Sequence, residues 1–258
     1  MAVDAQYSSM PIFDPLTRRL VVRVVYDGPG TAGKTTNVQQ ICRLFPISKR
    51  TEMFTPGALK GRTMFFDWLE VDLATRSKIP VRVQILSVTG QETRSYRRRP
   101  LLKSADAVVF VCDSRPEHLD NNRQRLLLLQ RYLRERHTPA PYLIQANKQD
   151  LPGALSPKEL LAQLRWKLPV SVLAAVASDA KGVTETFQQA ARAAAQYAQS
   201  IITERGLSAV AGIPETADGV FDNLLEFEDR LDSLEVRELD AEPSADEEQE
   251  HLCPVGGE

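Results

Sequence analysis

The sequence predicts an α/β fold, in which helices cover both faces of a mostly parallel sheet of six strands, followed by an acidic extension. Apolar runs typical of strands alternate with longer amphipathic segments along the first 200 residues, and this alternation is typical of a parallel sheet between two layers of helices. The 258 residues are 43% hydrophobic, which is enough to bury a full core. A glycine-rich loop directly follows the first long strand.

Each element of this fold has its own signal in the sequence. The near-continuous apolar run 107–112 is typical of a central parallel strand, whereas alternation in 64–73 and 81–86 predicts an edge hairpin with one wet face. Ser156 and Pro157 suit the N-cap and first position of a helix. The predicted strands are 19–27, 64–73, 81–86, 107–112, 141–147 and 170–176, and the predicted helices are 34–45, 119–136, 157–166, 183–203 and 220–239.

Charge divides the chain into two parts. Residues 1–200 contain 29 Lys and Arg against 17 Asp and Glu, whereas residues 201–258 contain 3 against 17. The first part could therefore face an anionic membrane or an acidic partner, and the second reads as a solvated acidic tail. We expect an irregular N-terminal arm (1–18), a folded domain (19–203), a Gly/Ala/Pro-rich linker (204–219), an acidic amphipathic helix (220–240) and a disordered acidic tail (241–258).

A phosphate-binding loop is the clearest motif in the chain. The stretch Gly28-Pro-Gly-Thr-Ala-Gly-Lys34-Thr35 matches G-x-x-x-x-G-K-[ST] and follows an apolar strand. The backbone N–H groups of such a loop wrap a diphosphate, its lysine neutralises the β- and γ-phosphates, and its last hydroxyl binds Mg²⁺. A plain glycine turn is the alternative. The residues expected to bind phosphate are Gly28, Gly30, Gly33, Lys34, Thr35 and Thr36, with Thr35 also a metal ligand.

A second motif, Asn147-Lys148-Gln149-Asp150, follows the strand 141–147. A carboxylate at the end of this pattern accepts hydrogen bonds from N1–H and N2–H₂ of guanine. Adenine lacks that donor pair, so the carboxylate would be left unpaired and ATP rejected by roughly 10⁴ or more. We therefore expect Asn147, Lys148 and Asp150 to bind the guanine of GTP or GDP rather than form an ordinary polar turn.

The stretch Ser87-Val-Thr-Gly90-Gln91-Glu92 resembles the D-x-x-G-Q-E segment of Ras-like GTPases. There the glycine N–H meets the γ-phosphate and the glutamine orients the attacking water, so we expect Gly90 to bind phosphate and Gln91 to be catalytic. A plain Gly-Gln turn is the alternative. Ser87 stands where an aspartate normally holds Mg²⁺ through water, and this replacement should weaken the retention of metal and nucleotide.

Four stretches together resemble the bacterial MglA family, small Ras-like GTPases that set cell polarity and switch motility systems. They are Gly28 to Asn37, which fits Gly-Pro-Gly-x-x-Gly-Lys-Thr-Thr-Asn, the segment Gly61-Arg-Thr-Met-Phe-Phe-Asp-Trp-Leu69, Pro141 to Pro152, and Ala175-Val-Ala-Ser178. A hydroxyl residue in place of the aspartate at 87 is also usual in that family. The resemblance covers about residues 19–203 and implies a P-loop G-domain.

The resemblance assigns roles to three further residues. Thr63 would bind Mg²⁺ and the γ-phosphate in the GTP state only, and Arg62 would be an arginine finger supplied in cis, worth roughly 10³–10⁵ in rate. A solvated loop arginine is the alternative for Arg62. Ala177 would offer its backbone N–H to guanine O6.

The resemblance also implies a partner, a Roadblock-fold homodimer that remodels the switch segments and stimulates hydrolysis. The basic segment 93–100, which contains Arg94, Arg97, Arg98 and Arg99, reads either as an exposed helix face or as a docking patch for an acidic partner, an anionic membrane or the acidic tail. No recognised nucleic-acid module accompanies it, so nucleic acid is not expected as a ligand. The chain shows no signal-peptide pattern and no paired cysteine spacing among its three cysteines. We therefore expect a cytoplasmic protein that is recruited to a cell pole or membrane periphery.

Taken together, the motifs predict a GTP-hydrolysing switch that uses Mg²⁺ and is slow on its own, since Gln91 and Arg62 sit in switch loops. A GTP-binding scaffold that turns over little GTP and acts through its C-terminal extension is the main alternative, because Ser87 replaces the usual aspartate. A P-loop kinase or ATPase is disfavoured by the guanine motif.

Overall fold

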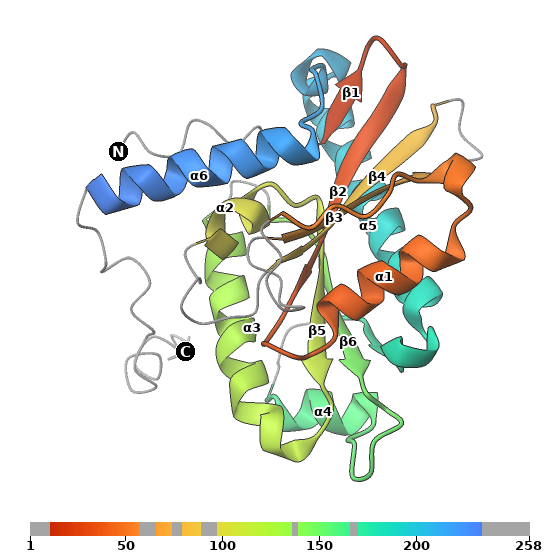
Figure 1. Ribbon diagram of the computed structural model, residues 1–258, viewed down its shortest axis with the longest axis vertical. Helices are drawn as coiled ribbons and strands as arrows, with labels where there is room; N and C mark the ends of the chain where they lie inside the picture. The colour runs from red at the N-terminus through yellow and green to blue at the C-terminus, as the bar shows by residue number, and fades with distance from the viewer. Residues whose placement is uncertain are drawn as a thin grey trace, which may run out of the picture.

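A central sheet with helices on both sides organises the molecule (Figure 1). The computed structural model describes residues 11–56, 66–73, 79–88, 97–135, 139–165 and 170–233, and side chains as far as residue 227. Within these residues the sheet has seven strands in the order β3-β4-β2-β5-β6-β7, with β1 paired to β2. The strands are β1 Ile12–Asp14, β2 Arg19–Asp27, β3 Phe66–Leu73, β4 Val81–Val88, β5 Ala107–Asp113, β6 Tyr142–Asn147 and β7 Val172–Ala174.

The strand pairing confirms the predicted fold class. Strands β4, β2, β5, β6 and β7 run parallel to one another, whereas β3 is antiparallel to β4 and β1 is antiparallel to β2. All six predicted strands are present, and β1 is an addition to them.

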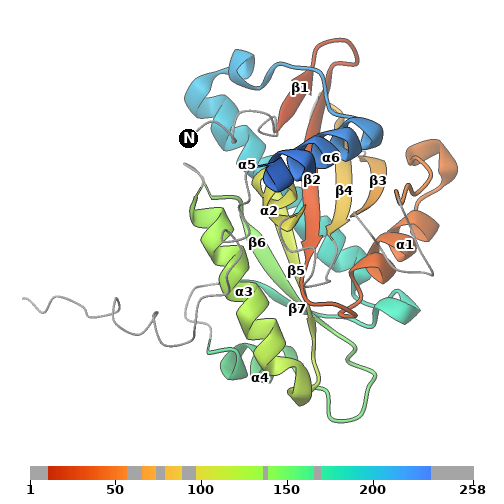
Figure 2. The same cartoon turned by 60° about the vertical axis from the view of Figure 1, so that its left-hand side comes forward.

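Helices cover both faces of this sheet. Figures 1 and 2 show α1 and α5 on one face, and α2, α3 and α4 on the other. The helices are α1 Lys34–Leu44, α2 Arg98–Lys103, α3 Leu119–Arg134, α4 Pro157–Gln163, α5 Val183–Arg205 and α6 Ala217–Ser233, and short 3₁₀ turns span η1 Ile47–Lys49, η3 Pro116–His118, η4 Ala177–Asp179 and η5 Leu207–Val210. The predicted helices 34–45, 119–136, 157–166 and 183–203 are therefore confirmed, with ends that differ by a few residues. The predicted helix 220–239 is confirmed as far as Ser233, where the described residues end.

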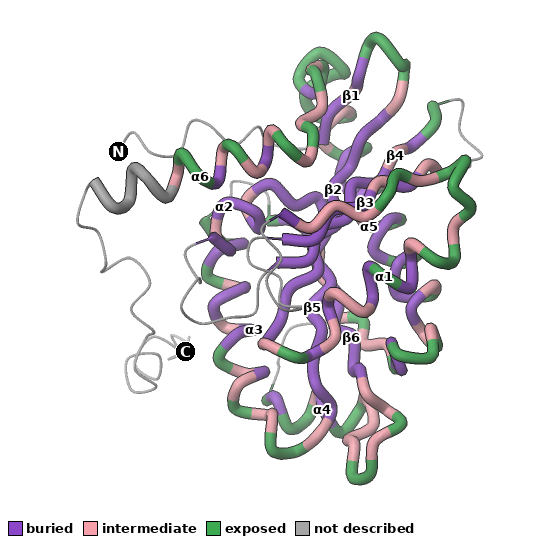
Figure 3. The backbone as a smooth tube through the Cα atoms, viewed as in Figure 1, coloured by how far each residue is buried: buried purple, intermediate pink, exposed green. Residues whose placement is uncertain are grey.

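Alternate side chains of the strands fill two separate hydrophobic cores. On β2, Val24 packs in the core beneath α1 and α5, whereas its neighbour Val25 packs in the core beneath α2 and α3. Side chains point to opposite faces in turn along a strand, so a strand buried on both faces needs a near-continuous apolar run. The buried strands are visible as the central purple segments of Figure 3. No helix in the described part of the chain is both long and apolar enough to span a membrane.

The N-terminal arm differs from the irregular segment predicted for residues 1–18. Residues 12–14 form β1, and Ile12 lies opposite Val21 in the ladder with β2. The Phe13 carbonyl also accepts a hydrogen bond from the N–H of Gly212. Three residues are too few to show the alternation on which strand prediction depends, and for that reason the sequence did not reveal β1.

The sequence predicted that one face of the β3–β4 hairpin is exposed to solvent, but helix α6 covers much of that face. Val220 and Leu224 of α6 are 1% and 0% exposed and belong to the same core as Phe66 and Trp68 of β3. Figure 2 shows α6 lying across this side of the sheet.

The linker predicted for residues 204–219 is shorter than expected. Helix α5 extends to Arg205, η5 occupies residues 207–210, and α6 begins at Ala217.

A buried arginine anchors the start of α6 to the sheet. Arg23 of β2 is 0% exposed, and its guanidinium donates to Gln84 Oε1 at 2.9 Å and to Glu215 Oε2 at 3.0 Å. Gln84 in turn donates to the Glu215 carbonyl at 2.8 Å. The guanidinium also lies 5.4 Å from the ring centroid of Trp68. Burial lowers the pKa of Arg23 and Glu215 opposes that effect, so the ion pair compensates part of the desolvation.

The basic segment 93–100 does not present its described arginines as a surface patch. Arg97 and Arg98 are 7% and 1% exposed, and Arg99 pairs with Glu135 at 2.8 Å. The prediction of a docking patch for an acidic partner, a membrane or the tail is therefore wrong for Arg97 and Arg98, which are buried, whereas Arg99 remains partly exposed beside Glu135. Residues 93–96 lie outside the described residues.

Candidate functional site

Loops at the carboxyl ends of the parallel strands bring the predicted binding residues together. The phosphate loop follows β2, Asp113 ends β5, Asn147 ends β6, and Ala177 follows β7. Helix α1, which follows β2, covers one face of the sheet, and α3, which follows β5, covers the other. The crevice between β2 and β5 is therefore a topological switch point, where open α/β sheets bind ligands.

The phosphate loop depends on two glycines. Gly28 has φ +137°, and a Cβ there would overlap the carbonyl oxygen of Val111 on β5. Gly33, with φ +106°, caps the N-terminus of α1, and a Cβ on it would overlap the side-chain nitrogen of Asn147. Both positions therefore require glycine for space as well as for conformation, and the loop leads into the N-terminus of α1, where the first N–H groups of a helix lack partners within the helix.

Lys34 lies inside the curve of the loop, 6% exposed. Its ammonium donates to the carbonyls of Gly28 at 2.9 Å and Pro29 at 2.6 Å. Burial lowers the pKa of Lys34 to about 8, an effect that Asp27 opposes and Arg98 reinforces. An anion placed against the ammonium would favour its charged form, so the loop holds a cation that gains from binding phosphate.

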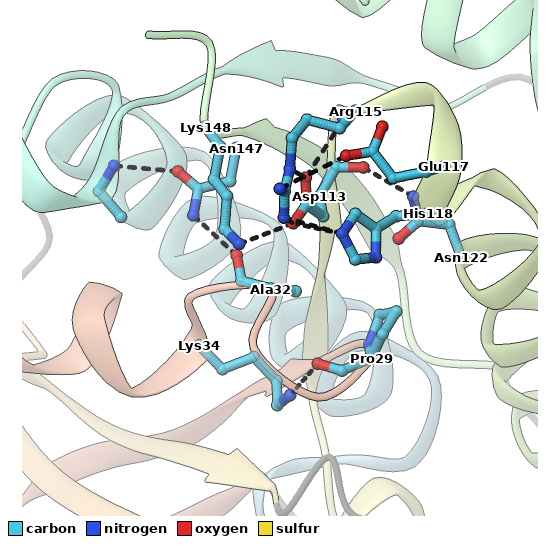
Figure 4. A network of polar contacts seen from close by, with 11 residues as sticks. Pro29, Ala32, Lys34, Asp113, Arg115, Glu117, His118, Asn122, Asn147 and Lys148 are labelled. Carbon is cyan, nitrogen blue, oxygen red and sulfur yellow. Dashed lines mark hydrogen bonds and ion pairs between the residues drawn. The ribbon is translucent and has the colours of Figure 1, made fainter. Parts of the chain in front are cut away.

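Asn147 joins three segments of the site (Figure 4). Its side-chain Nδ2 donates to the Ala32 carbonyl of the phosphate loop at 2.8 Å, and its Oδ1 accepts from the Ala177 N–H at 2.9 Å. The residue is 2% exposed, so both bonds are shielded from water and costly to break. The Ala177 N–H therefore has a protein partner, which differs from the predicted contact with guanine O6.

Lys148 and Asp113 form an ion pair beside Asn147. Lys148 has a left-handed backbone with φ +65°, and its ammonium lies 2.6 Å from Asp113 Oδ2. Arg115 also donates to Asp113, at 2.8 Å, and His118 Nε2 lies 3.5 Å away. Burial opposes ionisation of Asp113, but the hydrogen bonds from Arg115 and Lys148 outweigh it and lower the pKa of Asp113. Asp150, three residues after Asn147, is exposed.

A buried amide pair supports this arrangement from beneath. Asn37 of α1 and Gln145 of β6 exchange two hydrogen bonds, at 2.8 and 2.9 Å. Asn37 also donates to the Gly33 carbonyl at 2.9 Å, and Gln145 donates to Thr186 of α5 at 3.1 Å. The network connects the loop, the sheet and α5, and each bond in a buried network of this kind fixes the position of the next.

A buried ion pair anchors α2 to the start of the phosphate loop. The Arg98 guanidinium donates to both carboxylate oxygens of Asp27, at 2.7 and 2.6 Å. Asp27 is the last residue of β2 and is 0% exposed, while Arg98 is 1% exposed. Bidentate arginine–carboxylate pairs have a fixed geometry, so the pair links α2 to the loop at a set position. Sequence reasoning missed this role because the basic segment looked exposed.

At the other end of the loop, Thr35 lies against a carboxylate from β3. Thr35 Oγ1 donates to Asp67 Oδ2 at 2.6 Å, and Thr55 Oγ1 donates to Asp67 Oδ1 at 3.1 Å. Hydroxyl and carboxylate oxygens are the donor types that Mg²⁺ prefers, so this pair fits a magnesium site. Sequence reasoning assigned no role to Asp67.

Four predicted site residues, Arg62, Thr63, Gly90 and Gln91, lie outside the described residues. The other predicted residues, namely Gly28, Gly30, Gly33, Lys34, Thr35, Thr36, Asn147, Lys148, Asp150 and Ala177, all lie in or beside the loops at the carboxyl ends of β2, β6 and β7. Asp113, Asn37 and Asp27 are additional residues of the same region. The charged residue directly after the apolar run 107–112 was the one signal that could have revealed Asp113.

Comparison with known proteins gives consistent matches. Residues 12–193 match the model of the ADP-ribosylation factor family. The mutual gliding-motility protein MglA of Myxococcus xanthus (strain DK1622) is 33% identical over 179 residues, which cover 68% of this chain and 91% of that protein.

Among solved structures, the Arl6 BBS3 small GTPase from Trypanosoma brucei, with bound nucleotide analogue GppNp, matches with a TM-score of 0.50 and 23% identity. The match covers 69% of this chain and 99% of that one. At this level of identity the likeness supports the fold alone. The family match begins at residue 12, so it includes β1 as well as the predicted domain.

Proposed function

Since the chain belongs to the ADP-ribosylation factor family of small GTPases, we propose that it is a GTP-dependent switch that controls bacterial cell polarity or motility. The observation that carries the proposal is the Asn147 side chain, which ties the phosphate loop to the loop after β7. That bond pattern ties the loop 28–35 to the Asn-Lys-x-Asp run, which supports a nucleotide site shared by the two motifs. The relation to MglA supports the choice of pathway.

Binding of the nucleotide is divided among the loops. The N–H groups of the loop from Gly28 to Thr36 and the Lys34 ammonium bind the phosphates, at the positive end of the α1 dipole. Asp150 accepts hydrogen bonds from guanine N1–H and N2–H₂. Asn147 and Lys148 hold the loop after β6, which contains Asp150, in place. Ala177 acts through Asn147, because its N–H donates to that side chain.

Thr35 and, in the GTP state, Thr63 would hold Mg²⁺, which would neutralise charge on the phosphates. Gly90 donates its N–H to the γ-phosphate. Gln91 orients the attacking water, and Arg62 stabilises charge on the phosphoryl oxygens. Both catalytic side chains belong to segments that the MglA-like pattern identifies as switches, so hydrolysis is slow until a partner orders them.

A Roadblock-fold homodimer is the partner that the MglA-like sequence pattern supports. Such a partner would stimulate hydrolysis by ordering the segments that contain Arg62 and Gln91. The protein would then act at a cell pole or at the membrane periphery, where polarity switches work. The relation to MglA supports this assignment.

The C-terminal extension acts as a cover over the β3–β4 side of the sheet. Glu215 pairs with the buried Arg23, and Leu224 is buried against the core that contains Trp68. Strands β3 and β4 adjoin the segments that contain Thr63 and Gln91. A partner that docks on these strands would therefore have to displace α6, and this would tune access to the switch segments.

The cover can be tested with two adjacent leucines of α6. Leu224 is 0% exposed and Leu225 is 37% exposed, so Leu224→Asp should undock the helix while Leu225→Asp should leave it docked. We expect faster amide hydrogen exchange in residues 66–73 for Leu224→Asp only. Equal exchange in the two variants would contradict the cover.

A GTP-binding scaffold with little or no turnover is the second candidate, favoured by the docked α6 and by the serine at position 87. Multiple-turnover phosphate release from the full chain, compared between wild type and Gln91→Leu, separates the two. The switch requires measurable release that falls by about 10² or more in the variant. The scaffold requires no release above background in either protein.

A further inference from the structure

Two turns of the chain share one five-residue pattern. Residues 15–19 read Pro-Leu-Thr-Arg-Arg and residues 46–50 read Pro-Ile-Ser-Lys-Arg, so each contains a proline, an aliphatic residue, a hydroxyl residue and two basic residues in the same order. The first turn joins β1 to β2, and the second contains η1 and follows α1. Neither turn contains a residue of the proposed nucleotide site.

Each turn holds its aliphatic side chain out into solvent. Leu16 is 84% exposed and Ile47 is 77% exposed. The first turn is fixed by Asp14, whose carboxylate accepts a hydrogen bond from the Leu16 N–H at 2.9 Å. The second is closed by the Lys49 N–H, which donates to the Pro46 carbonyl at 2.8 Å. The exposure of both side chains is therefore set by the backbone of the turns.

The two basic residues of each pattern have different tasks. The second one ties the turn to the domain: Arg19 pairs with Asp72 at 3.2 Å, and Arg50 donates to the backbone carbonyl that follows α1 at 3.0 Å. The first one, Arg18 or Lys49, is exposed and belongs to none of the ion pairs within the described residues. Each turn therefore presents an exposed cation close to an exposed aliphatic side chain.

Both turns lie at the end of the sheet where β2 begins. An apolar groove of about 770 Å³ connects them, because its lining includes Phe13 and Leu20, which flank the first turn, and Phe45, which precedes the second. Leu44 and Ile79 add exposed apolar surface at the same end. Figure 1 shows this end at the top of the molecule, far from α4. Apolar side chains gathered on one surface in this way mark an interaction site, whereas scattered ones do not.

The local charge favours an anionic partner. From residue 15 to residue 51 the sequence has seven Lys and Arg residues but a single acidic residue, Asp27. Asp27 is 0% exposed and lies at the other end of β2. The whole chain has a net charge of −2, so attraction to an anionic surface has to come from this local excess of positive charge.

We propose that the turns 15–18 and 46–49 dock the protein on an anionic lipid bilayer. Leu16 and Ile47 enter the boundary between headgroups and acyl chains, while Arg18 and Lys49 contact lipid phosphates. The inference rests on the proposed function, which assigns the protein to the membrane periphery, and identifies the surface that it uses there. The first turn and the phosphate loop lie at opposite ends of β2, so a docked protein keeps its nucleotide site away from the bilayer.

Vesicle flotation of the full chain tests the proposal. Wild type should float with vesicles of phosphatidylcholine and phosphatidylglycerol in equal parts but not with pure phosphatidylcholine. Leu16→Ser combined with Ile47→Ser should lower the partition coefficient by about 10-fold or more, because two apolar side chains no longer leave water. Arg18→Gln combined with Lys49→Gln should lower it by about 10–30-fold, since each basic residue near an anionic surface contributes about 5-fold.

The controls are Leu225→Ser on α6 and Lys158→Gln at the start of α4, both at exposed residues away from the two turns. Both should partition like wild type. The proposal is overturned if either double variant partitions like wild type or if the controls lose as much as the double variants. Failure of wild type to float with anionic vesicles would also overturn it, in favour of a protein partner.

Labelled GDP separates this surface from the proposed switch. Both double variants should bind GDP as wild type does, because neither turn belongs to the nucleotide site. A loss of GDP binding in either double variant would show damage to the whole domain and would overturn the assignment of these residues to a separate surface. Failure of wild type to bind GDP would overturn the proposed switch, while vesicle binding would remain as predicted.

Discussion

The proposed guanine end and the proposed metal end of the site are built in different ways. At the proposed guanine end, Asn147 ends strand β6 and Lys148 follows it, and their polar groups are already bonded to Ala32, Ala177 and Asp113. At the metal end, Thr35 bonds to Asp67 of an edge strand, and the remaining predicted residues lie outside the described part of the chain. One end is fixed by the core of the fold, while the other is assembled across segments.

The two ends of the site correspond to the two tasks of a switch, which are selection of the base and regulated hydrolysis. Selection of the base should not change with the state of the switch, and it is supported by buried hydrogen bonds that rigidify the loops. Under the proposed function hydrolysis is off until a partner acts, which requires catalytic residues whose arrangement can change. Base selection and metal-dependent steps should therefore respond separately to mutation.

Asp150→Asn should have the largest effect on the guanine end. The asparagine cannot accept from both guanine donors, so affinity for GDP should fall by about 10⁴. The amide can donate to the C2 oxygen of xanthine, and so xanthosine diphosphate should become the preferred ligand. Competition against labelled GDP and labelled xanthosine diphosphate measures both effects. Asp179→Asn, at an exposed carboxylate of η4, should leave the preference for guanine intact.

Arg62→Ala tests the metal end, where it should lower single-turnover GTP hydrolysis by about 10³ if the arginine acts in cis. Affinity for GDP should stay within a few-fold of wild type, because Arg62 meets charge that develops only during the reaction. Arg43→Ala, at an exposed residue in the last turn of α1, serves as the control. A parallel loss of GDP affinity in Arg62→Ala would show that the two ends are not separate.

Lys34→Met addresses the loop that both ends share, through the pH dependence of the nucleotide-free protein. Burial lowers the pKa of Lys34 from 10.5 to about 8, so between these values the unfolded chain binds more protons than the folded one. The unfolding free energy of wild type relative to Lys34→Met should therefore rise by roughly 3 kcal/mol from pH 7 to pH 11. Denaturant unfolding at several pH values measures it, and a constant difference would contradict burial of a charged lysine.

The difference in stability between Gly33→Ala and its matched control, Gly153→Ala, should be the smallest of the four effects. Both glycines have positive φ, but only a Cβ at Gly33 would meet Asn147, whereas Gly153 faces open space. Each substitution costs about 1–3 kcal/mol of backbone strain, and Gly33→Ala should add about 1–3 kcal/mol for the displaced Asn147 amide. Thermal unfolding of the two variants measures the difference. Equal losses would mean that Asn147 does not clamp the loop.

Local patterns predicted the fold and most of the guanine end. The loop from Gly28 to Thr35 and the run from Asn147 to Asp150 are contiguous, and each carries its chemistry in fixed spacing. The alternation of apolar runs and amphipathic segments predicted the parallel sheet, because period and length differ between strands and helices. The roles of these residues toward nucleotide remain predictions.

Contacts between distant segments account for what sequence reasoning missed. Asp67 acquires its place beside Thr35 from the register of β3 against β4, which no local pattern encodes. Arg98 looked like part of a surface cluster but is buried against Asp27, because the partner lies 71 residues away. The docking of α6 over the β3–β4 side of the sheet likewise depends on a contact between distant segments, the ion pair of Arg23 with Glu215.

The most direct test of the central claim is competition of labelled GDP by unlabelled GDP and ADP, carried out in Mg²⁺ and again in EDTA. If the guanine end is fixed by the core, removal of Mg²⁺ should weaken the binding of both nucleotides. The affinity for GDP should still exceed that for ADP by about the same factor, roughly 10⁴. A preference for GDP that collapses when Mg²⁺ is removed, or effective competition by ADP in Mg²⁺, would contradict the account.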